Sequence, residues 1–522
     1  MMNRTQLIFY TVKQLKYKQF CYRLYYFIRK RFFNKDYAKE LQINNYKIIW
    51  EYELKIINSY VSKDTFVFLN LEKKFTEKID WNYSDFGKLW TYNLNYFDFL
   101  NQEQIKVEDG IYIIKNYIQN DQILKDGKEA YPISLRCINW VKFLSKHNIY
   151  DKKINQTLFN HYYILLKNIE YHIMGNHLLE NGFSLLFGAY FFRDEQIYNK
   201  GYSILKVELE EQILDDGAHF ELSPMYHQII LHRILDSINL IRLNPWKDDT
   251  LLNLLIEKAK LMLSWLKNVA YKDGSIPMVN DSAYNITFSS KDLLDYAQKL
   301  NIEFNTINLG ASGYRKINNE AYELFLDVGN IGPDYQPGHA HSDTFSFELM
   351  SKGRPFIVDT GTSTYEKNTI RQLERDTSSH NTVMINDKNQ SEVWGGFRVA
   401  KRAKILSLKE GKNYIEASHN GYKIDGYIHN RCFSWSDNII VIKDEISKKT
   451  DFKAKAFFHF DSEVTLKIKG DRVYVNDLKI EFSGAKSLHV EEYNLANGFN
   501  CTVKAQKIIA IFDNVLETQI FI

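Results

Sequence analysis

Cysteine is scarce in this sequence of 522 residues, and no apolar stretch in it is long. The four cysteines, Cys21, Cys137, Cys432 and Cys501, lie far apart and form no pairwise metal motif, so neither a disulfide framework nor a thiolate zinc site is expected. The N-terminus has no uninterrupted apolar run and no small-residue cleavage site, which argues against a signal peptide or a membrane span. The cysteine content suits a reducing compartment.

An excess of charge of one sign is also absent. The formal net charge is +3 and no basic block dominates either half, so nucleic acid is not expected as the main partner. With 45% hydrophobic and 25% charged residues, the composition is that of an ordinary globular protein. A chain of this length exceeds what one hydrophobic core organises, which favours two domains with a smaller element at one end.

Residues 1–79 are expected to form a basic, mostly helical extension. Their first part, MMNRTQLIFYTVKQLKYKQFCYRLYYFIRKRFF, distributes basic side chains among apolar and aromatic ones. One interpretation is a surface helix that packs its apolar side on the protein body. The other is a basic amphipathic helix that makes peripheral contact with an anionic membrane. Because no export signal is recognisable, we expect a cytoplasmic protein or one peripheral to the inner membrane, with a periplasmic location as the alternative.

Residues 80–305 show apolar residues at helical spacing, interrupted by loops that contain Asp-Gly. The pattern recurs at Asp126-Gly127, Asp216-Gly217 and Asp273-Gly274. It predicts helical hairpins whose loops fall on one rim of a solenoid or toroid, with an irregular helical domain as the alternative. Over residues 306–522 the apolar period changes to two, and short strands between Gly, Asn, Asp and Lys turns predict an antiparallel β-sandwich.

The segment PGHAHSDTFSFELMSKGRPFIVDTG suggests a metal site within an expected β-hairpin. If its first strand is regular, His339 and His341 point to the same face and the next strand brings Asp359 alongside. His380, in SSHNTVMIND, would join them from a third segment. Two imidazoles and one carboxylate suit zinc, or a similar divalent ion, with one position open. On spacing alone, polar residues satisfied by the backbone explain the pattern equally well.

The helical half supplies polar side chains at the starts of expected helices. Asn176 and His177 precede the hydrophobic run in IMGNHLLENGFSLLFGAYFF, although an N-cap explains Asn176 equally well. Tyr226 follows a proline at another expected helix start and lies on one of the recurring loops.

Candidate sugar contacts lie in segments that mix aromatic, amide and basic side chains. They are Trp90 and Asn93 in FGKLWTYNLNYFDFLN and Trp394 in WGGFRVAKR. Aromatic residues make up 15% of the chain, so packing in the core is the alternative interpretation for each ring.

The chain carries five motifs in the order GNHLLENG, DGAHFELSPMYH, GHAHSDTFSFEL, PFIVDTGTSTY and DTSSHNTVMIND. This set resembles the heparinase II/III-like polysaccharide lyases, which include alginate lyases of the same architecture. The resemblance implies an (α/α) toroid followed by an antiparallel β-sandwich, with the active site in a cleft between them. It also implies roles for individual residues: Asn176, His177, Tyr226 and His339 in catalysis, Tyr365 as a further site tyrosine, and His341, Asp359 and His380 as ligands of one divalent metal, with zinc favoured.

These side chains suit β-elimination from a uronic acid in an anionic polysaccharide or oligosaccharide. The proton beside the sugar carboxylate is poorly acidic until that charge is neutralised, and Asn176 with His339 or His177 could donate hydrogen bonds to it. Tyr226 would protonate the leaving oxygen and, for syn elimination, also act as the base. For anti elimination His177 is the better base.

Other chemistry fits the same residues. The metal is expected to orient His339 through its neighbour His341. The alternative is a catalytic metal that activates water for hydrolysis. A uronyl epimerase would remove the same proton and return it from the other face. A non-catalytic carbohydrate-binding protein is the third hypothesis.

Overall fold

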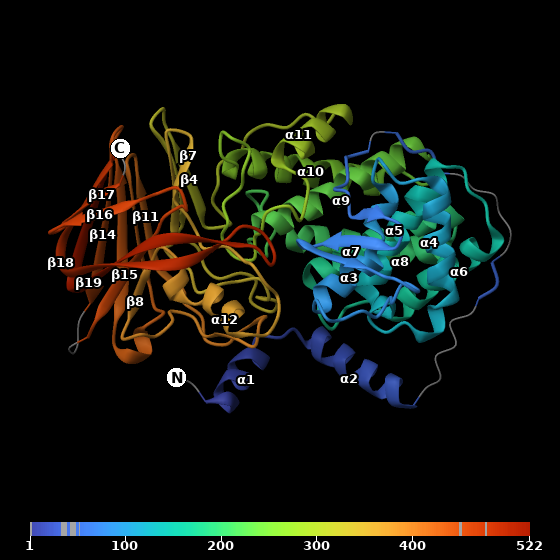
Figure 1. The fold of residues 1–522 in the computed structure, drawn as a ribbon, viewed down its shortest axis with the longest axis horizontal. Coiled ribbons are helices and arrows are strands. Elements are labelled where there is room, and N and C mark those ends of the chain that lie inside the picture. Colours follow the sequence, from blue (N-terminus) through green and yellow to red (C-terminus); the bar gives the residue numbers. More distant parts are fainter. Residues whose placement is uncertain (1–2, 33–38, 42–47, 52, 448–451, 476–477) are drawn as a thin grey trace.

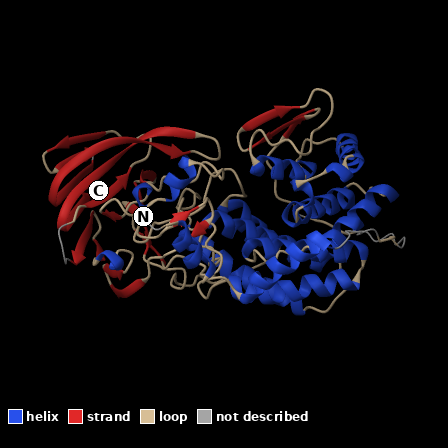
Figure 2. Ribbon diagram, turned by 90° about the horizontal axis from the view of Figure 1, so that it is seen from below, coloured by secondary structure: helices blue, strands red, loops and turns tan. Residues whose placement is uncertain are grey.

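Helices fill one end of the molecule and strands the other (Figures 1 and 2). The computed structural model describes residues 3–32, 39–41, 48–51, 53–447, 452–475 and 478–522. The last long helix of the helical domain ends at Lys299, and the first strand of the β domain begins at Tyr314. The order of a helical domain followed by an antiparallel β domain confirms the predicted fold class.

The helical domain is built around helices that are buried on almost every side. α7 is buried along nearly its whole length, and α5 packs against one side of it while α8 packs against another. Side-chain caps begin several helices, because Asp151, Asp194 and Ser223 each accept a hydrogen bond from a first-turn backbone amide. The helices are α3 (Lys88–Tyr96), α4 (Val107–Gln119), α5 (Ala130–Lys146), α6 (Lys152–Lys167), α7 (Gly175–Phe192), α8 (Glu195–Gln212), α9 (Pro224–Leu243), α10 (Thr250–Val269) and α11 (Ser290–Lys299).

The β domain consists of two sheets with a shared core. Among the described residues the smaller sheet has the order β4-β5-β6-β7, and the larger has β11-β12-β13-β14-β19-β18-β17-β16, with β15 pairing both β19 and β8. Apolar side chains from both sheets, including Leu324, Phe347 and Phe433, form one buried cluster, which makes the domain a sandwich. The strands are β4 (Tyr314–Asn318), β5 (Tyr322–Asp327), β6 (Phe347–Ser351), β7 (Arg354–Ile357), β8 (Val383–Ile385), β11 (Ile405–Gly411), β12 (Tyr414–His419), β13 (Ile428–Trp435), β14 (Ile439–Ser447), β15 (Ala454–His459), β16 (Leu466–Lys469), β17 (Arg472–Val475), β18 (Leu478–Ala496) and β19 (Thr502–Phe521).

The loops of the β domain contain further short elements. A helix, α12 (Thr369–Arg375), and a two-stranded ribbon of β9 (Val393–Trp394) and β10 (Arg398–Val399) lie between β7 and β11. The sequence indicated only strands and turns over residues 306–522, so α12 was not expected. Its N-cap is Asn368, whose side chain accepts from the amide of Arg371.

The N-terminal extension is only partly helical. α1 (Arg4–Val12) lies below the β domain and α2 (Tyr17–Phe32) lies below the helical domain in Figure 1. A three-stranded antiparallel sheet, β1 (Tyr60–Ser62), β2 (Thr65–Phe68) and β3 (Leu71–Lys74), follows within the same extension and was not expected from the sequence. Phe66 and Phe68 of this sheet pack on the core of the helical domain.

The expected strand over residues 339–343 is a loop, so that prediction was wrong. β6 begins only at Phe347, and the segment before it is closed by a turn in which the amide of Ser346 donates to the carbonyl of Asp343. Phe345 adopts a φ of 68°, which an extended strand does not allow. The alternating-face argument therefore does not apply to His339 and His341, whose side chains are directed by their own partners.

Gly217 and Gly274 occupy two of the recurring Asp-Gly turns and make a matched pair for mutation. Their φ angles are 87° and 88°, but a Cβ at Gly217 would lie 2.0 Å from the carbonyl oxygen of Leu261, whereas one at Gly274 would meet nothing within 4 Å. We expect Gly274→Ala to lower the free energy of unfolding by about 1–2 kcal/mol through backbone strain. Gly217→Ala should lower it by roughly 1–3 kcal/mol more because α10 must move. Urea unfolding of both variants measures this difference, and equal losses would contradict it.

Candidate active site

A buried carboxylate joins the two domains at the centre of the site. Glu221, in the loop before α9, is 2% exposed. Its Oε1 accepts from the backbone amide of Asn176 at 2.9 Å, and its Oε2 lies 2.5 Å from Nδ1 of His339 in the β domain. Burial alone would raise the pKa of this carboxyl, but the charge and hydrogen bond of His339 outweigh burial and hold the pKa at about 2. Glu221 therefore stays ionised and fixes the orientation of the His339 ring.

The backbone at the start of α7 is shaped to receive Glu221. Gly175 has a φ of 61°, and a Cβ there would lie 2.4 Å from Oε1 of Glu221. The preceding residue, Met174, also has a positive φ of 67°. Strain of this kind persists only where the surroundings impose it. The turn allows the carboxylate to approach the first amides of α7, where the helix dipole also favours a negative charge.

Three rings from different parts of the chain are stacked beside this carboxylate. The ring centroids of Tyr226 and His339 are 3.8 Å apart with an interplanar angle of 12°, and His339 and Tyr365 follow at 6.4 Å and 15°. The hydroxyl oxygens of Tyr226 and Tyr365 are 3.2 Å apart. Burial raises the pKa of Tyr226 above its ordinary value, while the hydrogen bond with Tyr365 opposes that rise. The resting form of Tyr226 is therefore the neutral phenol.

His177 is held by a second buried carboxylate of the helical domain. Its Nδ1 is 3.0 Å from Oε1 of Glu170, and the other oxygen of Glu170 accepts from the side-chain amide of Asn181 at 3.0 Å. The ring of Tyr131 lies 4.4 Å from the imidazole. Burial lowers the pKa of His177, but the charge and hydrogen bond of Glu170 outweigh burial, and the net shift is upward. The charged imidazolium is thus favoured.

A third carboxylate, Asp281, binds two side chains of the β domain. It lies in the loop after α10 and is fully buried. Arg371 donates to both of its oxygens at 2.5 and 2.7 Å, and Nε2 of His341 lies 2.8 Å from its Oδ1. The backbone amide of Asp281 also donates to the carbonyl of His339. Burial would raise the pKa of Asp281, but Arg371 and His341 hold it well below the usual range.

The residues expected to hold a metal lie close together, but each already makes a hydrogen bond within the protein, His341 to Asp281 and His380 to Asp359. His341 and His380 have ring centroids 5.2 Å apart, and Oδ2 of Asp359 is 2.7 Å from Nδ1 of His380. Within the described residues, no three His, Cys, Asp or Glu side chains are arranged as a ready-made ligand set. Three buried atoms nevertheless lack a hydrogen-bond partner, namely Nδ1 of His341, Nε2 of His380 and Oδ2 of Asp343. Two imidazole nitrogens and a carboxylate oxygen are donors that suit a divalent ion.

Two family models match this chain in succession. The model for the heparinase II/III N-terminus matches residues 133–301, and the model for the heparinase II/III-like C-terminal domain matches residues 303–513. The chain belongs to the heparinase II/III-like family. The matches include both halves of the site described above, from Glu170 to His380.

Similar proteins of this family are named as lyases of heparin sulfate. The chain is 26% identical over 307 residues to a heparin-sulfate lyase of Bacteroides stercoris, which covers 53% of this chain and 44% of the lyase. It is 25% identical over 301 residues to a heparin-sulfate lyase of Bacteroides thetaiotaomicron. That match covers 48% of this chain and 40% of the lyase. The chain thus matches less than half the length of these relatives. The crystal structure of heparinase III superposes with a TM-score of 0.66 at 19% identity, covering 86% of this chain and 80% of that one, and shows a shared toroid and sandwich fold.

The expected sugar contacts of this family member lie in different environments. Trp90 is fully buried and its indole donates to the carbonyl of Leu71, so its ring is part of the core and closed to a sugar. Asn93 is partly buried and donates to the carbonyl of Leu89 within its own helix. Trp394 is partly exposed, and its indole donates to Thr11 of α1. Tyr365 is the expected contact that the structure brings beside Tyr226.

Four charged residues that organise the site were not singled out from the sequence. Glu221 lies inside the motif DGAHFELSPMYH, and Asp281 lies in the loop that follows Asp273-Gly274. Both therefore belong to segments that the sequence pattern had already marked. Glu170 and Arg371 stand outside every quoted motif. No local pattern distinguishes them from surface charges, because only burial against a partner far along the chain gives them their role.

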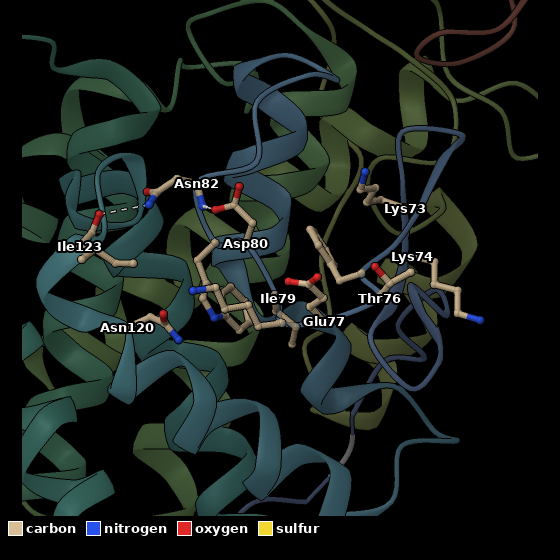
Figure 3. A pocket seen from close by; sticks show the side chains of 12 residues that line it. Lys73, Lys74, Thr76, Glu77, Ile79, Asp80, Asn82, Asn120 and Ile123 are labelled. Carbon is tan, nitrogen blue, oxygen red and sulfur yellow. Dashed lines mark hydrogen bonds between the residues drawn. The ribbon is translucent and has the colours of Figure 1, made fainter.

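A separate pocket opens beside β3 (Figure 3). It encloses about 420 Å³ and none of the candidate catalytic residues lines it. Its charged lining is mixed, since Lys73, Lys74 and Lys78 accompany Glu77 and Asp80. Such a lining does not favour an anionic sugar in particular. The lining residues are Lys73, Lys74, Phe75, Thr76, Glu77, Lys78, Ile79, Asp80, Trp81, Asn82, Asn120 and Ile123.

Proposed function

We propose that this protein is a polysaccharide lyase that cleaves a uronic-acid-containing polysaccharide by β-elimination. The observation that carries the proposal is the stacking of Tyr226, from the helical domain, on His339, from the β domain. The same Glu221 that orients His339 also binds the backbone of Asn176. The start of α7, which carries Asn176, is thereby tied to the same carboxylate as the imidazole that stacks on Tyr226. Membership of the family and the names of its lyase relatives support the same reaction.

Neutralisation of the sugar carboxylate is the first task of these residues. In the proposed mechanism the side-chain amide of Asn176 and the imidazolium of His177 donate hydrogen bonds to the carboxylate. Charge that develops on it as the neighbouring proton leaves is then stabilised by oriented donors. The contact with Glu170 raises the pKa of His177 and so favours its charged form, which is better suited to donate than to act as the base.

Tyr226 then carries out the proton transfer. Because Glu170 favours the charged form of His177, which cannot act as the base of anti elimination, we propose syn elimination on the face of the sugar that Tyr226 contacts. Tyr226 must first lose its phenolic proton to solvent; the phenolate then takes the proton beside the carboxylate, and the phenol so formed gives it to the leaving glycosidic oxygen. The Tyr365 hydroxyl, 3.2 Å away, can donate to the phenolate and offset part of the penalty of burial. His339, held by Glu221, keeps the ring of Tyr226 in place.

A divalent ion, for which zinc is the best match, would be held by the pair His341 and His380 together with Asp359. It would supply a fixed positive charge and a rigid link between the loop before β6 and the segments that carry Asp359 and His380. The two unpaired imidazole nitrogens support this proposal. In that role the ion supports His339 through its neighbour, as outer-shell groups support a catalytic side chain.

The lyase proposal is tested by substitution of the stacked pair. We expect Tyr226→Phe to lower kcat by about 10²–10⁴ because proton transfer is lost, and His339→Ala to lower it by about 10² because Tyr226 loses the ring that holds it in place. The assay follows ultraviolet absorbance of unsaturated products from heparan sulfate, hyaluronan, alginate and bacterial capsule polymers. Tyr414→Phe and His489→Ala, at exposed positions of the β domain, are the matched controls and should retain full activity.

Two results would overturn the lyase proposal. One is that no uronate polymer yields unsaturated ends with the parent protein. The other is solvent deuterium incorporation into intact polymer without chain cleavage, which would make the protein an epimerase on the same residues.

Glu170→Gln tests the charge of His177. Without Glu170 the largest remaining influence is burial, which lowers the pKa of His177, although Glu221 and Glu129 still act in the opposite sense. If His177 works as the imidazolium, the alkaline limb of the kcat/KM profile moves to lower pH. If His177 were the neutral base, the acidic limb would move to lower pH instead and activity in acid would rise. Glu103→Gln, at an exposed ion pair, is the control and should leave the profile unchanged.

The proposed metal site is tested by metal analysis and by thermal unfolding. Elemental analysis of the purified protein should find a divalent ion, and zinc added to the metal-free protein should raise its melting temperature because the ion binds only the folded state. His341→Ala combined with His380→Ala should abolish both effects, while His489→Ala should abolish neither. A zinc-dependent rise that persists in the double variant would remove these residues as ligands.

A further inference from the structure

The N-terminal helix α2 is attached to the protein through its polar side. Gln19, fully buried, donates to the carbonyl of Ile173 at 2.9 Å. The hydroxyl of Tyr26 donates to the carbonyl of Ile169, and Arg29 donates to the side chain of Asn168 at 2.6 Å. These contacts all fall on the loop between α6 and α7. Tyr22 also packs on the core of the helical domain. The face of α2 that meets the protein is therefore polar and aromatic, whereas the simple interpretation of the sequence expected the apolar side there.

The apolar side of α2 faces away from the protein. Six large side chains form what we call the outer stripe, and at about 100° per residue they lie within an arc of about 140°. Single exposed apolar residues are common on protein surfaces, but a contiguous stripe marks an interaction site. The outer stripe consists of Tyr17 (82% exposed), Phe20 (58%), Leu24 (52%), Phe27 (62%), Ile28 (41%) and Phe32 (69%). α1 adds the exposed residues Ile8, Phe9 and Val12.

Positive charge borders the outer stripe. On the helical wheel Lys18 follows one edge of the stripe, Arg23 and Lys30 follow the other, and Arg31 falls within the arc at the C-terminal end of the helix. Residues 3–32 contain eight basic residues and no acidic one. A mainly apolar stripe with cations at both edges and at one end is typical of helices that lie in a membrane interface, where long cationic side chains reach the headgroups.

We propose that α1 and α2 dock on an anionic lipid surface. Phe, Leu and Ile side chains at the centre of the stripe offer nothing to the hydroxyls or sulfates of a sugar, whereas they gain from entering the acyl boundary. A second copy of the chain docked stripe to stripe would bring the bordering cations together, and no acidic residue of the segment would compensate them. No described helix combines the length and the apolar character needed to cross a bilayer.

Docking in this way would place the catalytic residues close to the membrane. Gln19 bonds the carbonyl of Ile173, three residues before Asn176, and Thr11 accepts from Trp394 of the β domain. The extension thus contacts both domains near the site. If the proposed lyase function holds, its substrate is a glycan presented close to lipid headgroups; the docking itself does not depend on that function.

Vesicle flotation tests the proposal with the full chain. Vesicles of equal parts phosphatidylcholine and phosphatidylglycerol should carry the protein upward at low salt, and vesicles of phosphatidylcholine alone should carry much less. Phe20→Gln, Leu24→Gln and Phe27→Gln combined should weaken binding by about tenfold or more. Lys13→Gln, Lys30→Gln and Arg31→Gln combined should weaken it roughly fivefold for each charge removed.

Matched controls separate the stripe from general surface changes. Ile123→Gln, Val207→Gln and Ile424→Gln combined remove three apolar side chains that are 62%, 55% and 71% exposed elsewhere, and should leave flotation unchanged. Melting curves must match across all variants, which is expected because the replaced side chains are exposed.

Three outcomes would overturn the proposal. The first is no flotation with anionic vesicles. The second is flotation that persists in the outer-stripe variant. The third is a concentration-dependent dimer in analytical ultracentrifugation that the outer-stripe variant abolishes while vesicles remain unbound, which would assign the surface to a second copy. Loss of uronate-cleaving activity has no bearing on any of these readouts.

Discussion

The ionised carboxylate of Glu221 is the contact on which the site depends. A buried charge is strongly unfavourable unless it is paired, and here the partners come from the start of α7 and from the loop before β6. Because Glu221 itself precedes α9, one side chain fixes two helix starts and one β-domain loop relative to each other. The stacked rings of Tyr226 and His339 follow from that arrangement.

His339 and His341 lie in the same loop, but each bonds to a different carboxylate of the helical domain. His339 turns to Glu221, and His341 turns to Asp281, which Arg371 also binds. In a regular strand both imidazoles would point to one face and compete for one environment. The loop conformation separates them, so one ring can stack on Tyr226 while the other lies beside His380 in a buried polar pocket. The conformation of the loop backbone is therefore the reason why His339 and His341 have different roles.

The N-terminal extension shows how packing can reverse an amphipathic pattern. The periodicity of residues 17–32 defines an apolar side and a polar side but does not say which of them meets the protein. Gln19 and Tyr26 find backbone carbonyls in the α6–α7 loop, and these contacts direct the outer stripe to solvent. The same side chains tie the extension to the segment that leads into Asn176.

The sequence by itself determined the fold class and most of the residues of interest. Helical periodicity with Asp-Gly turns and the later change to a period of two were enough for a helical domain followed by a sandwich, because burial of one face leaves that period in the sequence. Motifs were enough to select Tyr226, His339 and Tyr365, which the structure brings together. Tertiary structure alone decided the rest. It placed Trp90 in the core, turned the expected strand at 339–343 into a loop, and revealed Glu221 and Asp281 as the anchors of the site. Buried carboxylates of this kind do not follow the helical or strand periodicity of the sequence. A carboxylate can hold the site together only when residues distant in the chain exclude water from it and supply its hydrogen-bond partners.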